Sequence, residues 1–136
     1  MVEFDLAQVK QWLLSREVRL CAPVDPAEIA KAQHIFAGQF PASLLKMYES
    51  FDGFADGDFE AESFISIWPL SKSLNFAQEQ SQRDTLAFAD WSFECDVAIC
   101  QILDPAAPVS WIGGCKPDSG SFKDFWAMFR RGQLSG

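Results

Sequence analysis

The sequence predicts an α+β domain in which helices come first, a block of mainly antiparallel strands follows, and one helix closes the chain. Up to Gly53, apolar residues recur at helical spacing, with Gly and Pro breakers between the segments. Beyond Gly53 they form short β-prone runs that are separated by turns rather than by helical crossovers. Strands joined in this way pair antiparallel, and their segregation from the helices is typical of the α+β class.

The first two helices are predicted from their N-caps. Asp5 can cap a helix over residues 5–16, because a carboxylate at this position accepts hydrogen bonds from the free amides of the first turn. Asp25 followed by Pro26 is a stronger start signal, since proline suits the first helical position. Gly38 can adopt the left-handed backbone that ends this second helix.

The stretch 36–53 contains the end of the second helix and all of the third. Pro41 fits the first turn of the third helix, and Gly53 ends it. The residues that recur at helical spacing between them are Leu44, Leu45, Tyr48 and Phe51. This pattern predicts a helix packed into the core, so we interpret the stretch as a scaffold that leads into the acidic segment after it.

Four strands are expected after these helices. Residues 64–70 are apolar and β-prone, and residues 85–91 and 96–103 indicate two strands with a polar turn between them, which predicts a hairpin. Residues 109–112 indicate a fourth strand. The polar residues 71–82 fit a short, exposed helix or a loop.

A last helix is predicted near the C-terminus. Residues 113–120 are expected to be flexible because of their glycine, proline and serine content. Ser121 can cap a helix that follows them, and Gly132 can end it. The apolar residues at positions i, i+3, i+4 and i+7 of this helix are Phe122, Phe125, Trp126 and Phe129. Their spacing predicts an amphipathic C-terminal docking helix.

The chain is acidic and rich in aromatic residues. Its 11 basic and 19 acidic side chains give a formal charge of −8, and 14% of its 136 residues are aromatic. Such a surface repels nucleic acid and anionic membranes and favours basic partners, although acidity can also serve solubility alone. We therefore expect a single domain over residues 1–136 that binds a protein, with no nucleic-acid partner and no membrane association.

The N-terminus and the cysteines indicate a cytoplasmic protein. The first residues lack a basic region followed by an apolar run, so no signal peptide is expected. The four cysteines form no Cys-x-x-Cys pair and have no histidine close in sequence, so neither a metal site nor a cofactor is expected. Buried, reduced thiols are the favoured interpretation for the four cysteines, which are Cys21, Cys95, Cys100 and Cys115.

No catalytic set emerges from the sequence, and we expect no enzymatic activity. His34 is the sole histidine, and its position within a predicted helix favours a structural role. Cys115 beside Lys116 could be a reactive thiol, but no base accompanies it. Carboxylate chemistry needs a defined separation across a cleft, which sequence spacing does not give. The available pairs are Asp56/Asp58, Glu60/Glu62 and Asp90/Asp96.

Two acidic segments with interleaved aromatic residues are the candidate binding sites. The first contains no lysine or arginine and comprises Asp52, Phe54, Asp56, Asp58, Glu60 and Glu62. The second lies at the predicted hairpin and comprises Asp90, Trp91, Glu94 and Asp96. Acidic and aromatic side chains together suit the recognition of a basic partner. The alternative is a solvated loop whose phenylalanines point into the core.

Three motifs follow one another over about residues 25–130. The first comprises Ile29, Ala32, Gln33, Phe36, Gly38, Phe40 and Pro41, and continues through Leu44, Tyr48, Asp52 and Gly53. The second pairs Phe88-Ala89-Asp90-Trp91 with Asp96-Val97-Ala98-Ile99, and the third is Ser121-Phe122-x-x-Phe125. In order and spacing they resemble the SUKH superfamily, which includes the yeast cell-wall assembly regulator and many bacterial toxin-immunity proteins.

The resemblance implies helices packed against a curved sheet and a protein-binding role, commonly that of a cytosolic antidote to a toxin. We therefore expect a non-catalytic immunity protein that binds a basic toxin domain through an acidic face. A regulatory or scaffold module that binds a host protein without any toxin is the alternative. A small hydrolase that uses an unpaired set of carboxylates is the third hypothesis.

Overall fold

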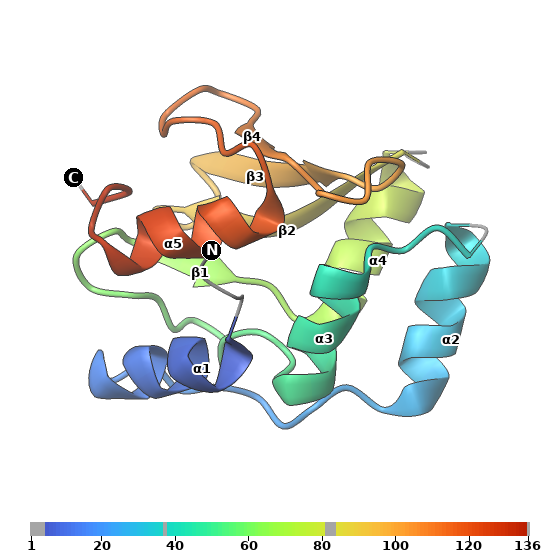
Figure 1. Cartoon of the computed structure of the whole chain (residues 1–136), viewed down its shortest axis with the longest axis horizontal. Helices are drawn as coiled ribbons and strands as arrows, with labels where there is room; N and C mark the ends of the chain where they lie inside the picture. Colours follow the sequence, from blue (N-terminus) through green and yellow to red (C-terminus); the bar gives the residue numbers. More distant parts are fainter. Residues whose placement is uncertain (1–4, 37, 81–83, 136) are drawn as a thin grey trace.

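The computed structural model describes residues 5–36, 38–80 and 84–135, in which five helices accompany one four-stranded sheet (Figure 1). Three helices precede the first strand, and one helix follows the last strand, so the predicted α+β class and element order are confirmed. The elements in chain order are α1 (Leu6–Ser15), α2 (Pro26–Ile35), α3 (Ala42–Ser50), β1 (Ile65–Ile67), α4 (Leu70–Glu79), β2 (Thr85–Trp91), β3 (Asp96–Gln101), β4 (Val109–Trp111) and α5 (Phe122–Arg130).

The predicted caps of α1, α2 and α5 and the glycine stops of α2 and α5 are confirmed, whereas α3 ends at Ser50, before the predicted stop at Gly53. The side chains of Asp5, Asp25 and Ser121 each accept a hydrogen bond from a backbone amide of the first turn, at 3.0, 2.9 and 3.0 Å. Gly38 and Gly132, which follow α2 and α5, have φ angles of 77° and 75°. Only glycine adopts this backbone without steric cost, so the predicted stop signals have a direct conformational cause.

The strands form an antiparallel sheet in the order β1-β2-β3-β4. Ile67 pairs with Ala89, and Ser66 pairs with Asp90. Because side chains alternate between the two faces of a sheet, Ile67 and Ala89 share the core face while Ser66 and Asp90 share the opposite face. The register of β2 against β3 shifts between Ala87 and Ala89, and such a bulge bends the strand.

Helix α5 lies between the sheet and the N-terminal helices, and it contacts both α1 and α3 (Figure 1). On its sheet side, the rings of Phe122 and Phe125 lie 5.3 and 5.1 Å from the ring of Phe88 in β2. On its other side, Phe129 makes an edge contact with Trp12 of α1 at 5.1 Å. The aromatic stripe of α5 therefore joins the two layers of the core, as its spacing predicts.

The segment between β1 and β2 is more buried than its composition suggests. Residues 71–82 are polar, but most of them belong to α4, and residues 81 and 82 lie outside the described part of the chain. The carboxylate of Asp52 accepts a hydrogen bond from the amide of Leu70 at 2.7 Å and so satisfies the first turn of α4. The buried residues of this helix are Leu70, Ser73, Leu74 and Ala77.

Two further observations concern membrane-spanning helices and the cysteines. None of the helices in the described ranges is long and apolar enough to cross a membrane. The four cysteines form no disulfide, but the expectation that they are buried holds only for Cys100. Cys21 is half-buried, and the expectation is wrong for Cys95 and Cys115, which are exposed.

Replacing Gly53 by alanine is expected to lower the free energy of unfolding by about 2–4 kcal/mol. Gly53 has a φ of 70°, and a Cβ atom there would lie 2.5 Å from the backbone carbonyl carbon of Trp68. Gly57 is the matched control, since its φ is 76° but a Cβ atom would meet nothing within 4 Å. Gly57→Ala should cost only about 1 kcal/mol, and equal losses in urea unfolding would contradict this account.

Candidate functional site

The structure brings the two predicted acidic segments side by side. They flank the pairing of β1 with β2, and the amide of Ser92 donates a hydrogen bond to the carbonyl of Phe64 at 3.0 Å. Residues of both segments line one pocket of about 160 Å³. The acidic and aromatic side chains from the two segments that line this pocket are Asp56, Asp58, Phe59, Asp90, Phe93 and Glu94.

The start of the first segment belongs to the interior of the fold. Phe54 is 1% exposed and forms a backbone bridge with Leu20, so it does not reach the surface that a partner would contact. Asp52 caps α4, and burial raises its pKa even though the hydrogen bond from Leu70 acts against the shift. For Phe54 the structure favours the alternative of a phenylalanine that points into the core, whereas Asp52 is half-buried and its carboxylate is engaged by α4.

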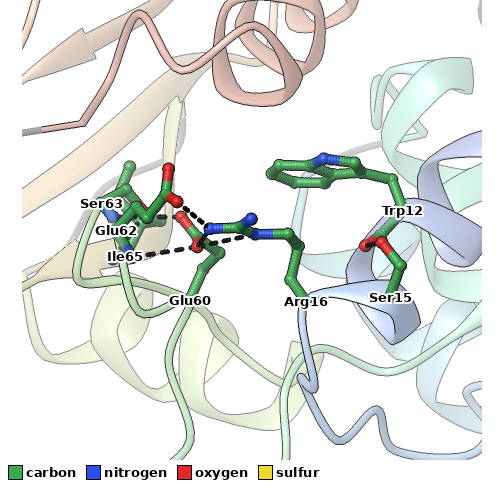
Figure 2. A network of polar contacts seen from close by, with 7 residues as sticks. All are labelled: Trp12, Ser15, Arg16, Glu60, Glu62, Ser63 and Ile65. Atoms are coloured by element: carbon green, nitrogen blue, oxygen red, sulfur yellow. Dashed lines mark hydrogen bonds and ion pairs between the residues drawn. The ribbon is translucent and has the colours of Figure 1, made fainter.

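Glu60 is a buried carboxylate that ties the acidic segment to α1 (Figure 2). It accepts hydrogen bonds at 3.0 Å from the amides of Glu62 and Ser63 and from the guanidinium of Arg16. Burial acts to raise the pKa of Glu60, but these hydrogen bonds together outweigh burial and hold the pKa below its usual value. The same guanidinium contacts the exposed carboxylate of Glu62 at 2.7 Å.

Asp58 and Asp96 also bind the backbone of their own chain. Asp58 accepts a hydrogen bond from the amide of Arg19 at 2.6 Å and contacts its guanidinium at 3.5 Å. Asp96 accepts hydrogen bonds from the amides of Gly113 and Cys115 at 2.6 and 3.0 Å. Burial acts to raise the pKa of Asp96, and these amide bonds outweigh it and lower the pKa. The segment 113–120, which was expected to be flexible, is therefore anchored at its start by a carboxylate on β3.

The remaining predicted residues reach the surface to different extents. Asp90 is nearly buried and accepts hydrogen bonds from the indole of Trp68 and the amide of Glu94. Trp91 is half-buried. Asp56, Glu62 and Glu94 are the exposed members of the predicted set.

Three phenylalanines form the most exposed aromatic cluster of the described chain, and we call Phe59, Phe64 and Phe93 the aromatic triad. The ring of Phe59 lies 5.8 Å from that of Phe64 and 5.4 Å from that of Phe93. Phe64 is 45% exposed and Phe93 is 74% exposed. The sequence pattern predicts Phe64 in a strand and Phe93 in a polar turn, so neither was a candidate binding residue. The aromatic residue within the turn Ser-Phe-Glu was nevertheless a signal of an exposed ring.

The backbone that carries the triad is strained. Phe64 has a φ of 60°, and the turn residues Ser92, Phe93 and Glu94 have φ angles of 53°, 56° and 69°. Each residue with a side chain pays about 1–2 kcal/mol for this left-handed conformation. A glycine or asparagine turn would avoid the cost, so the presence of an exposed phenylalanine here points to a role outside folding.

Four carboxylates and one ammonium surround the pocket of about 160 Å³. We call it the triad pocket. The carboxylates of Asp56, Asp58, Asp90 and Glu94 are named the acidic rim. Lys72 of α4 contacts Glu94 at 3.4 Å and Asp90 at 3.9 Å. Arg19 contacts a third rim carboxylate, that of Asp58, at 3.5 Å. The four carboxylates of the rim thus carry more negative charge than these two cations neutralise.

Carboxylates, phenyl rings and one ammonium are the charged and aromatic groups that line the pocket. No histidine or cysteine lines it, and the described residues contain no group of three or more potential ligands that could hold a metal ion. His34 is exposed on α2. Burial and the neighbouring Asp96 raise the pKa of Cys115 to about 11, which keeps this thiol protonated and poorly nucleophilic at neutral pH.

Comparison with known proteins adds no family to this picture, because no family model matches the chain and no curated protein matches its sequence.

Replacing Glu60 by glutamine should lower the free energy of unfolding at neutral pH by about 1–3 kcal/mol, since an amide cannot accept all the hydrogen bonds made by the carboxylate. Glu62→Gln is the control. Glu62 pairs with the same Arg16 from an exposed position, with 63% side-chain exposure, and should cost less than about 0.5 kcal/mol.

The effect of Glu60→Gln should depend on pH. Because the pKa of Glu60 is lower in the folded than in the unfolded chain, its contribution is present above the ordinary value of 4.5 and is lost as the pH falls through the folded pKa. Urea unfolding between about pH 7 and pH 3 should show the wild type and the variant converging in acid. A constant difference would refute the role of the ionised carboxylate.

Proposed function

We propose that this chain is a non-catalytic protein-binding domain that docks a basic partner through the aromatic triad and the acidic rim. The observation that carries the proposal is the exposure of Phe93 at the tip of a strained turn, in ring contact with Phe59. Aromatic side chains of this kind are the common energetic centres of protein interfaces. Carboxylates around them select a partner of opposite charge.

The size of the pocket favours a macromolecular partner over a small-molecule substrate. Sites for drug-sized ligands usually enclose about 300–1,000 Å³, whereas the triad pocket holds about 160 Å³. A pocket this small accommodates one side chain of a partner whose remaining contacts lie on the surrounding surface. The net charge of −8 would attract a basic partner over a longer range.

The resemblance to the SUKH superfamily supplies a biological setting for such a domain. In this setting the chain is a cytoplasmic immunity protein that occludes a basic toxin domain. The alternative, a regulatory module that binds a host protein, would use the same aromatic triad. Purification from the native cell, followed by identification of the bound protein, separates the two, since a toxin domain supports the first and a host protein overturns it.

Phe93→Gly should weaken the affinity for the captured partner by at least about tenfold. The same change should leave the free energy of unfolding within about 1 kcal/mol of the wild type, because glycine relieves the left-handed strain at this position. Calorimetric binding and urea unfolding on the same samples test both statements. Leu103→Ala is the control, since Leu103 is 61% exposed at the opposite end of the β2–β3 hairpin and should not affect binding. A Phe93→Gly variant that binds normally would contradict the proposal.

The electrostatic part of the proposal predicts a dependence on salt. Raising the salt concentration from about 50 to about 500 mM should reduce the affinity by about tenfold or more, mainly through slower association. Stopped-flow kinetics at several ionic strengths measures the association rate directly. An affinity that is unchanged over this range would leave the acidic rim without a role in recognition.

A further inference from the structure

We propose that the triad pocket receives one arginine side chain from the partner, an inference that rests on the proposed protein-binding function. The pocket combines three features that a guanidinium requires. These are an enclosure of side-chain size, exposed aromatic faces, and carboxylates that face the same space.

The volume of the pocket restricts the occupant to a single side chain. At about 160 Å³ it is far smaller than the usual site for a free organic ligand. The adjoining pocket beside α4 holds about 300 Å³ and shares Lys72 and Glu94 with the first. The main chain of a bound segment therefore has room to continue along the surface after one side chain has entered the triad pocket.

The position of Lys72 shows that the lining of the triad pocket accommodates a cation. Its ammonium lies 4.6 Å from the centre of the Trp68 ring and contacts Glu94 at 3.4 Å and Asp90 at 3.9 Å. An aromatic face combined with carboxylates thus already holds one positive charge in the free protein. Such cation–π contacts strengthen when they are shielded from water, as they would be beneath a docked partner.

Negative charge remains for a second cation. Asp56 is exposed and makes no hydrogen bond or ion pair with other described residues. The side chain of Glu94 is 57% exposed and shares Lys72 with Asp90. An anionic or neutral side chain would leave these carboxylates uncompensated, so charge complementarity selects a basic occupant.

Arginine fits the pocket better than lysine. The rings of Phe59 and Phe64 are stacked with an interplanar angle of 25°, and the ring of Phe93 stands at 75° to Phe59. A planar guanidinium can stack on such a face while its donors reach two carboxylates, whereas an ammonium is a compact, strongly hydrated point charge. The structure therefore assigns arginine as the anchor residue.

The test uses short peptides and two-dimensional NMR of the full chain. The probe is Ac-Gly-Ser-Arg-Ser-Gly-NH₂, and the matched probes replace arginine by lysine or by citrulline, which has nearly the shape of arginine but no charge. The arginine peptide should shift the amide signals of residues 56–59, 64–66 and 92–94. Its affinity should exceed that of the citrulline peptide by about fivefold or more and that of the lysine peptide by about twofold.

Two variants complete the experiment. Glu94→Gln should reduce the preference for arginine over citrulline, because it removes one of the rim carboxylates, whereas Glu49→Gln, which changes an exposed glutamate on α3, should leave it intact. Equal shifts with citrulline, shifts located elsewhere, or no effect of Glu94→Gln would overturn the inference. If the peptides fail while Phe93→Gly still weakens partner binding, the arginine anchor is wrong and the docking surface stands. If Phe93→Gly leaves partner binding unchanged, the proposed function itself is wrong.

Discussion

The buried carboxylate of Glu60 is the interaction on which the surface of this protein depends. An ionised group costs free energy to bury, and here two backbone amides and the guanidinium of Arg16 compensate for that cost. These contacts fix the turn between Phe59 and Phe64 against α1. Since this turn immediately precedes β1, the same carboxylate helps to hold Phe59 and Phe64 beside Phe93 of the β2–β3 hairpin. The carboxylates of the acidic segment thus have two roles. Some accept hydrogen bonds from backbone amides and hold the segment in place, and others are exposed to solvent.

The hairpin turn carries residues that folding alone would not favour. Folding alone would favour glycine or asparagine where the backbone is left-handed, and it would not expose a phenyl ring. The chain instead places Phe93 at such a position with 74% of its surface exposed. Strain of this kind persists only where surrounding contacts determine the conformation, and the hydrogen bonds between the hairpin, Asp90 and Phe64 supply them. A rigid aromatic side chain held in this way loses little entropy on binding, which favours affinity.

The sequence was sufficient for the fold class and the order of the elements, but only partly sufficient for the bounds of β1 and α4 and for the proposed site. Caps such as Asp25 and Ser121 act within one helical turn, so their positions could be predicted from neighbouring residues. The role of Asp52 could not, because its hydrogen-bond partner on α4 lies 18 residues away. The acidic composition drew attention to two segments that the structure places around one pocket. Composition could not separate the carboxylates that accept hydrogen bonds from buried amides from those that face solvent. Membership of the aromatic triad depends on β1–β2 pairing and on left-handed backbone, and neither is encoded in local periodicity.

Hydrogen exchange of the free chain and of its partner complex tests the central claim most directly. The amides of residues 56–59, 63–66 and 92–94 surround the aromatic triad, and partner docking should slow their exchange most strongly. The outer faces of α1 and α2 should exchange at the same rate in both states. Protection that falls on α1, α2 or β4 while the hairpin exchanges freely would contradict the claim that this protein binds through the aromatic triad.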